Sequence, residues 1–208
     1  MKILKAVLIL TVFTIFSGNL FAQRVLIGPR FAGNFNIYNQ KGLTGTYNGL
    51  GLTAGGQVDV LFNQHIGLMV NINAFDMKNF GRSSTANNVT TDESYSLSYA
   101  SIDPLFKAEF NGFYFGAGPS FGFKLNSSGE VTQTATGQAP VVTPNDIETK
   151  SVRFDLVINT GYNFKLSPDM FLGSDFNVYI PLTDTYNTPG VSNSILSLKL
   201  GVALKFRI

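Results

Sequence analysis

At residues 196–208 the sequence reads Leu196-Ser197-Leu198-Lys199-Leu200-Gly201-Val202-Ala203-Leu204-Lys205-Phe206-Arg207-Ile208. From Leu196 onward every second residue is large and apolar, and the residues in between are small or cationic. Because successive side chains of a strand point to opposite faces of a sheet, this alternation predicts one strand with an apolar face and a polar face. A soluble barrel would bury the apolar face, whereas a transmembrane barrel turns it outward to lipid.

The same alternation recurs in seven earlier segments, at about residues 25–37, 52–62, 66–75, 99–110, 113–124, 153–164 and 171–182. The connections between segments alternate between long (38–50, 79–94, 126–149, 183–193) and short (63–65, 111–112, 165–169). This asymmetry is typical of an outer-membrane barrel, which has long external loops and short periplasmic turns. We therefore predict an all-β fold, an eight-stranded antiparallel up-and-down transmembrane barrel. The last strand should pair with the first, and both mature termini should be periplasmic.

Charged residues within the segments fall in the register opposite the large apolar residues. They are Arg30, Asp59, Asp103, Lys107, Glu109, Lys124, Arg153, Asp155, Asp175, Lys199, Lys205 and Arg207, and Asp76 is the one acid in the apolar register. A charge that faces lipid at the bilayer midplane costs roughly 2–4 kcal/mol, so these side chains are expected to face the lumen. An eight-stranded barrel encloses little more than side chains. We therefore expect a paired, structural charge network that plugs the lumen.

Residues 1–22 have a basic start, an apolar run too short to span a bilayer as a helix, and a small residue, Ala22, at the end. This pattern predicts a cleaved signal peptide, followed by a barrel domain at 23–208. The alternative is an uncleaved anchor helix. Cleavage would leave equal numbers of basic and acidic residues, which argues against a nucleic-acid partner. The chain has no cysteine and so no disulfide framework.

A secreted soluble barrel, similar to a lipocalin, is the alternative to the membrane barrel. The absence of Trp is a mild point in its favour, since aromatic girdles of membrane barrels usually contain Trp. The prolines are a difficulty for any closed barrel, because Pro29, Pro104, Pro119 and Pro181 lie within predicted strands. A closed barrel has no free edge where a missing N–H is harmless. We therefore predict bulges or slipped registers at some of these prolines.

The inventory of reactive residues is poor. His65 is the only histidine and falls in a short turn. This excludes a Ser-His-Asp triad and a histidine metal site in the long loops. We therefore assign no catalytic, cofactor-binding or metal-binding residue and expect no cofactor and no enzymatic activity. Two alternatives stay open: a narrow channel, and a barrel enzyme that acts on lipid through a Ser, Asp or Glu at the external rim.

Three stretches resemble the PorT-like family of outer-membrane β-barrel proteins: 28–35 (GPRFAGNF), 102–110 (IDPLFKAEF) and 112–119 (GFYFGAGP). The resemblance implies an eight-stranded barrel related to the transmembrane domain of OmpA, and some family members are accessory factors in protein secretion. We expect a small outer-membrane protein with a structural, binding or secretion-accessory role. Its expected partners are outer-membrane lipid, the barrel-assembly machinery and a protein bound at the loops 79–94 and 126–149.

Overall fold

A computed structural model describes residues 24–42, 45–145, 148–186 and 192–208, so the predicted signal segment lies outside the described residues. In this part of the chain no helix is long and apolar enough to cross a membrane. The described residues form nine strands: β1 (Arg24–Gln40), β2 (Tyr47–Leu61), β3 (Ile66–Ala86), β4 (Val89–Phe110), β5 (Phe113–Ala135), β6 (Val141–Pro144), β7 (Val152–Lys165), β8 (Met170–Pro181) and β9 (Asn193–Arg207).

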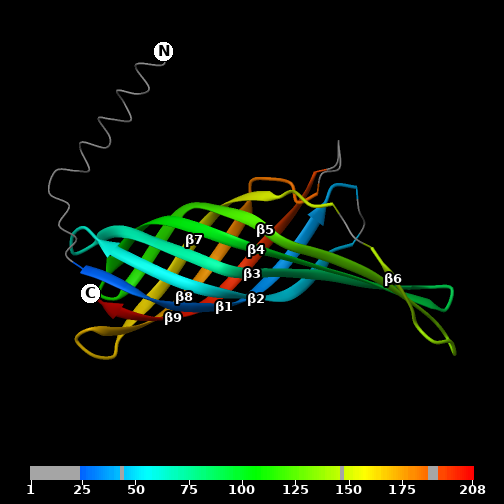
Figure 1. The fold of residues 1–208 in the computed structure, drawn as a ribbon, viewed down its shortest axis with the longest axis horizontal. Coiled ribbons are helices and arrows are strands. Elements are labelled where there is room, and N and C mark those ends of the chain that lie inside the picture. The colour runs from blue at the N-terminus through cyan, green and yellow to red at the C-terminus, as the bar shows by residue number, and fades with distance from the viewer. Residues whose placement is uncertain (1–23, 43–44, 146–147, 187–191) are drawn as a thin grey trace, which may run out of the picture.

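Eight of these strands close into a ring, which confirms the predicted antiparallel barrel (Figure 1). The sheet runs β4-β3-β2-β1-β9-β8-β7-β5, and β4 also pairs with β5 to complete the ring. As expected, β9 pairs with β1, from Leu26 opposite Arg207 to Gln40 opposite Asn193. Every neighbouring pair is antiparallel. β6 lies outside the ring, beside the far end of β5.

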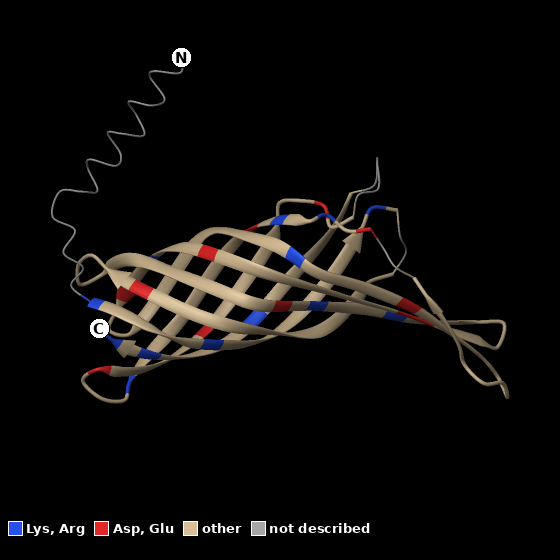
Figure 2. Cartoon of the chain, in the orientation of Figure 1, with Lys and Arg blue, Asp and Glu red and all other residues tan. Residues whose placement is uncertain are grey.

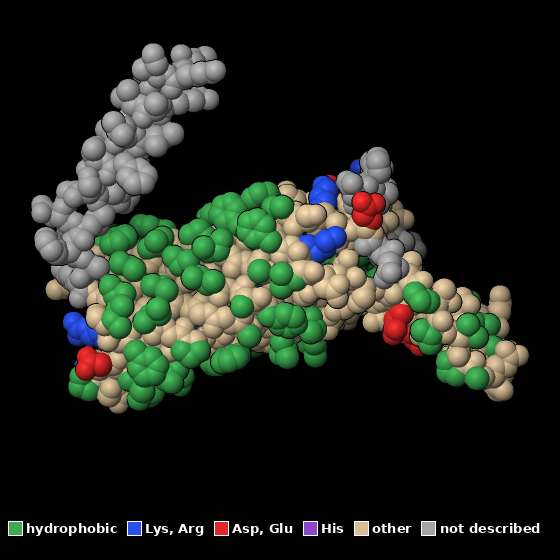
Figure 3. Space-filling view, in the orientation of Figure 1, with side chains coloured by type: hydrophobic (Ala, Val, Ile, Leu, Met, Phe, Trp, Pro, Cys, Tyr) green, Lys and Arg blue, Asp and Glu red, His purple; other side chains and the backbone are tan. Residues whose placement is uncertain are grey.

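The wall of the barrel is apolar outside and polar inside. Phe31 and Leu200 are 59% and 69% exposed, whereas the neighbouring Arg30 and Lys199 are almost fully buried. Figure 3 shows hydrophobic side chains spread over the outer wall, with the visible charges at the two ends. A soluble lipocalin-like barrel would bury its apolar face, so that alternative does not describe this molecule.

The three short connections are tight turns at one end of the barrel. The β4–β5 hairpin turns at Asn111 and Gly112, whose φ angles are +51° and +88°. Both positions of a type I′ turn need positive φ, which Asn and Gly tolerate best. Arg24, at the start of β1, pairs with Leu61 beside a second short turn, and Arg207 pairs with Leu26. The first and last described residues of the chain therefore both lie at the end of the barrel that carries the short turns (Figure 1).

Two predicted loops are largely strand, and the loop prediction was wrong there. β3 and β4 continue through residues 79–94 with an intact ladder and turn at Asn87 and Asn88, both with positive φ. β5 continues to Ala135, and its residues 130–133 pair with β6. Apart from a few valines these segments are polar on both faces, a composition that resembles a loop in sequence, but their threonines favour strands. We call residues 82–86, 89–94, 129–135 and 141–144 the extension, because this four-stranded sheet projects beyond the barrel (Figure 1).

The prediction of bulges or slipped registers at the prolines was also wrong. Pro104 and Pro119 interrupt the β4–β5 ladder, yet the register is the same on either side of them. Pro29 likewise drops out of the β1–β9 ladder without a shift, and Pro181 pairs at the last position of β8. A missing N–H removes hydrogen bonds but inserts no residue, so the register survives. The register shifts lie elsewhere, at Ala54/Gly55, Asn73/Asp76 and Ser98/Tyr99.

The closing strand supplies a direct test of assembly. Phe206 pairs with both Ile27 of β1 and Met170 of β8, and Arg207 donates its N–H to the carbonyl of Asp169. Deleting residues 206–208 should therefore open the ring at the short-turn end and block membrane assembly. Heat-modifiable migration on gels and protease resistance would measure it. Deletion of Ile208 alone is the control and should assemble normally; normal assembly of the longer truncation would contradict the barrel-closing role.

Candidate functional site

The structure places ten of the twelve predicted lumen charges inside the barrel; Lys124 is only partly buried, and Arg207, at the end of β9, is exposed, so the lumen prediction was wrong for Arg207. Arg30, Asp59, Asp103, Lys107, Glu109, Arg153, Asp155, Asp175, Lys199 and Lys205 are each no more than 5% exposed. Figure 2 shows such charges distributed along the barrel strands from one end to the other. Buried charges are tolerated only when they are paired and hydrogen-bonded, so the question for each is its partner.

At the short-turn end two lysines share one carboxylate. Lys107 and Lys205 lie 2.8 and 2.9 Å from Oδ2 of Asp59, and all three side chains are buried. Lys107 also lies 2.8 Å from Oε2 of Glu109, which forms a further ion pair with Arg24. The residues come from β1, β2, β4 and β9, so this cluster ties together strands from both ends of the sequence.

The middle of the lumen holds a second ion pair and a carboxylate with neutral donors. Arg30 donates to both carboxylate oxygens of Asp175, at 3.0 and 2.6 Å, which is the bidentate geometry that suits a guanidinium. Asp103 instead accepts hydrogen bonds from three neutral side chains: Asn73, Ser120 and Tyr179. The lumen is therefore crossed at this level by direct side-chain bonds.

Asp76 belongs to the lumen, contrary to the apolar register that the sequence assigns to it. The register of β3 against β4 shifts between Asn73 and Asp76, and this bulge turns the following residues by one position. Asp76 is thereby buried and pairs with Lys199 at 2.8 Å and with Lys78 at 3.3 Å. Lys78 was also missed. Asp76 and Lys78 occupy even-numbered positions, whereas the polar Asn71 and Asn73 before them occupy odd-numbered positions. This switch of the polar residues from odd to even positions was the sequence signal for the bulge.

Lys124 and Arg153 lie nearer the other end of the barrel. Arg153 donates to Asp155 at 2.8 Å and also to the backbone carbonyl of Ile195. Lys124 is only partly buried, and its amine donates to the carbonyl oxygen of Thr149 at 3.0 Å. Lys124 was expected to be balanced by an acid, but its described partner is a neutral carbonyl, because the residue sits at the rim rather than within the lumen.

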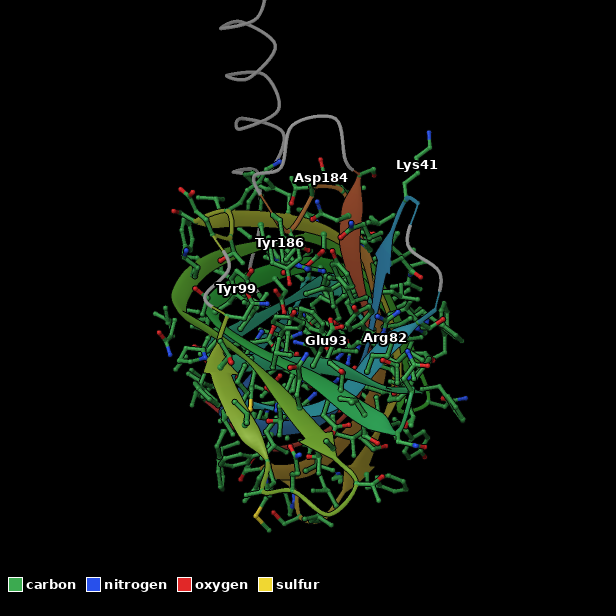
Figure 4. All side chains as sticks on the ribbon, turned by 90° about the vertical axis from the view of Figure 1, so that its right-hand side faces the viewer. Lys41, Arg82, Glu93, Tyr99, Asp184 and Tyr186 are labelled. Carbon is green, nitrogen blue, oxygen red and sulfur yellow. The ribbon has the colours of Figure 1, made fainter. Side chains whose placement is uncertain are left out.

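Aromatic side chains close the mouth at the end opposite the short turns. Tyr38 stacks on Phe80 with ring centroids 4.9 Å apart and meets Tyr186 edge-on at 5.5 Å. Tyr99 is also buried here, in the same cluster. Figure 4 looks onto this mouth and shows Tyr186 and Tyr99 within the ring of strands. The cluster places a layer of packed apolar surface above the charged lumen.

A set of contacts between three side chains joins this aromatic cluster to the base of the extension. Tyr47 donates its hydroxyl to Glu93 at 2.6 Å, and the guanidinium of Arg82 lies 4.8 Å from the Tyr47 ring. Arg82 also pairs with Glu93 at 3.3 Å. Burial, followed by the hydrogen bond to Glu93, raises the pKa of Tyr47 to about 12. Sequence analysis missed these residues because Arg82 and Glu93 fall in a segment predicted as loop.

The reactive side chains of the described residues mostly take part in structural contacts. No group of three or more His, Cys, Asp or Glu in this part of the chain is arranged to hold a metal ion. His65 lies in a short turn, where its ring stacks on Phe110 at 4.8 Å. The buried carboxylates described above are already engaged by lysine, arginine or neutral donors. The arrangement is suited to filling a lumen and holding strands together.

Replacing Asp76 by Asn should strongly destabilise the barrel. The change leaves Lys78 and Lys199 buried without their shared carboxylate, and breaking a buried ion pair costs about 3–5 kcal/mol. Denaturant unfolding of the protein in lipid vesicles would measure it. Asp92→Asn is the matched control: Asp92 is exposed on the extension, so its loss should change the free energy of unfolding by less than about 0.5 kcal/mol. Equal effects of the two substitutions would contradict the structural role of Asp76.

Of three solved structures that resemble the chain, only AlkL is similar enough to support the fold. No curated protein matches the chain. Among solved structures, the outer-membrane protein AlkL is 13% identical, with a TM-score of 0.53, covering 89% of this chain and 90% of AlkL. Neisserial surface protein A is 10% identical, with a TM-score of 0.45, covering 88% of this chain and 97% of that one. Ail of Yersinia pestis, solved with a heparin analogue, is 12% identical, with a TM-score of 0.42, covering 88% and 100%.

A family model described as "Outer membrane protein beta-barrel domain" matches residues 21–187, which is most of the chain. The matched segment includes strands β1 to β8. Its description agrees with the apolar outer wall and the charged interior. The chain therefore belongs to the outer-membrane β-barrel domain family.

Proposed function

We propose that this outer-membrane barrel is a non-enzymatic protein that conducts nothing through its lumen and acts by binding a partner at the extension. We further propose that residues 1–22 are a cleaved signal peptide, that both mature termini are periplasmic and that the barrel-assembly machinery inserts the chain. On this proposal the protein is PorT-like, and a secretion-accessory role is one form that its binding function could take. The observation that carries the proposal is a filled lumen combined with an exposed extension.

The lumen is a poor path for a solute. Lys107 and Lys205 meet Asp59 at the short-turn end, and Arg30 meets Asp175 in the middle. The far mouth is closed by the aromatic cluster around Tyr38. A permeating ion would have to separate buried ion pairs, each of which costs several kcal/mol to break. These features argue against the narrow-channel alternative.

The extension is the part of the molecule most suited to recognition. β3, β4 and β5 are 21, 22 and 23 residues long, about twice the roughly 9–11 residues that a tilted transmembrane strand needs. The surplus stands clear of the barrel and carries hydrophobic side chains only in patches between polar ones (Figures 1 and 3). With the termini in the periplasm, the extension faces the cell exterior. The exposed apolar wall below it fits outer-membrane lipid as the surrounding partner.

Conductance separates this proposal from the channel alternative. Purified protein in planar bilayers should give no conductance steps, because the lumen is filled from the Asp59 cluster to the Tyr38 cluster. A porin reconstituted under the same conditions serves as the control for insertion and detection. Reproducible steps from this protein would restore the narrow channel as its function.

Trimming the extension tests the binding role. One variant replaces residues 84–91 and 131–143 each by Asn-Gly, a pair that favours tight hairpins, and so keeps the aromatic mouth. The trimmed protein should remain heat-modifiable and should lose any partner that the intact protein yields by cross-linking and pull-down from intact cells. His65→Ala, at the opposite end, is the control and should retain that partner. Retention by the trimmed variant would contradict binding at the extension.

A further inference from the structure

β6 gives the extension an open strand edge. It pairs on one side with β5, from Val141 opposite Gln133 to Pro144 opposite Glu130. On its other side the sheet ends, because β6 is the terminal strand in the strand order of the described residues. Val141 and Val142 are 63% and 57% exposed, so this edge is apolar as well as unpaired.

The direction of the free backbone groups follows from one hydrogen bond. Asn145, just after β6, donates its N–H to the carbonyl of Gly129 on β5. In an antiparallel pair, alternate residues turn both N–H and C=O toward the same neighbour. The backbone N–H and C=O groups of Val141 and Thr143 therefore point toward β5. The backbone polar groups of Val142 and Pro144 point toward the open edge. The edge offers the N–H and C=O of Val142 and the C=O of Pro144, because proline has no N–H.

The β6 edge can pair with only a short added strand, but its side chains do not repel one. Natural proteins blunt exposed edges with short strands, charges and proline. β6 is four residues long and ends in proline, which restricts pairing to a short segment. Yet its two valines carry no charge that would repel an added strand. The other edge of the extension, at 82–86 on β3, carries Arg82 and otherwise small or hydroxyl side chains, so it lacks this apolar character.

Two acids lie on one face of the extension, Glu130 on β5 next to β6 and Asp92 on β4, one strand further from β6. Asp92 pairs with Thr132 and Ser94 pairs with Glu130, so Asp92 and Glu130 are diagonal neighbours on one face. Diagonal positions are roughly 7–8 Å apart, and like charges at this range repel. Both are exposed, and neither forms an ion pair with any other described residue. Val142 shares this face, because it pairs with Thr132.

We propose that the β6 edge receives an extended, cationic segment of a partner polypeptide as an added strand. This rests on the proposed function and names the chemistry of its partner. The added strand exchanges backbone hydrogen bonds with Val142 and donates to Pro144. Its cationic side chains reach across β6 toward Glu130 on β5, and its apolar side chains lie on the opposite face beside Val141. Asp92 lies on β4, one strand further away, and adds only to the negative field of that face. β-strand addition of this kind obtains affinity from the main chain and specificity from alternate side chains.

The test uses the full-length protein in lipid nanodiscs and a short labelled peptide of alternating lysine and valine. Fluorescence anisotropy should show binding that weakens as salt is added, because the charges are exposed. Amide hydrogen exchange should show new protection at Val142. Val142→Pro removes the outward N–H but no hydrogen bond to β5, so it should weaken binding about tenfold. Val142→Ala keeps the N–H and is its matched control.

The charge contribution is tested separately. The double variant Glu130→Gln with Asp92→Asn should weaken binding and abolish its salt dependence. A peptide of alternating glutamate and valine should bind at least tenfold more weakly than the lysine peptide. Equal binding of the two peptides, unchanged binding by Val142→Pro, or protection at 82–86 instead of β6 would overturn the proposal. So would self-association that Val142→Pro abolishes, since the occupant would then be a second copy.

Failure here differs from failure of the proposed function. If the lysine peptide does not bind but the trimmed variant loses a cellular partner, the extension binds something other than a cationic strand. If the trimmed variant keeps its partner, the binding role itself is wrong, whatever the peptide does.

Discussion

The constraint on which this structure depends is that eight strands enclose little more than their own inward side chains. The charged side chains that turn inward therefore find most of their partners among one another. Asp59 with Lys107 and Lys205, and Arg30 with Asp175, show how this is met: the partners come from different strands and meet across the lumen. Removing one partner would leave a charge without solvent or counterion, which is far more costly than losing the pair.

A filled lumen changes where activity can occur. With the interior occupied by ion pairs and the far mouth closed by tyrosines, recognition is left to surfaces outside the lumen, and the extension projects furthest from the barrel wall. The wall is covered with exposed aliphatic and aromatic side chains, as expected of a surface that faces lipid. The extension is held to the barrel through Tyr47, Arg82 and Glu93, so it rises from a packed base. Tyr47 therefore belongs both to the aromatic cluster in the mouth and to the base of the extension.

The sequence predicted those features of the structure that a local residue pattern determines. The strict alternation at 196–208 was enough to identify the closing strand and its apolar face. Asp76 was misplaced because a single extra residue between Asn73 and Asp76 reverses the parity of everything after it, and no local propensity marks that bulge. The polar strands at 79–94 looked like loops, since neither of their faces is buried against lipid. The partners of each lumen charge depend on the stagger of the closed barrel, which alternation alone does not contain.

The lumen ion pairs also bear on the time course of folding. Lys205 and Asp59 are 146 residues apart, and Arg30 and Asp175 are 145 residues apart. Contacts of such large sequence separation carry a high loop-closure entropy and form slowly. Until β9 arrives, Asp59 has neither its lysine from that strand nor a closed wall around it, and its charge must stay hydrated. The buried ion pairs of the lumen are therefore complete only once β9 closes the ring, and a chain that stalls before that step keeps these charges in contact with water.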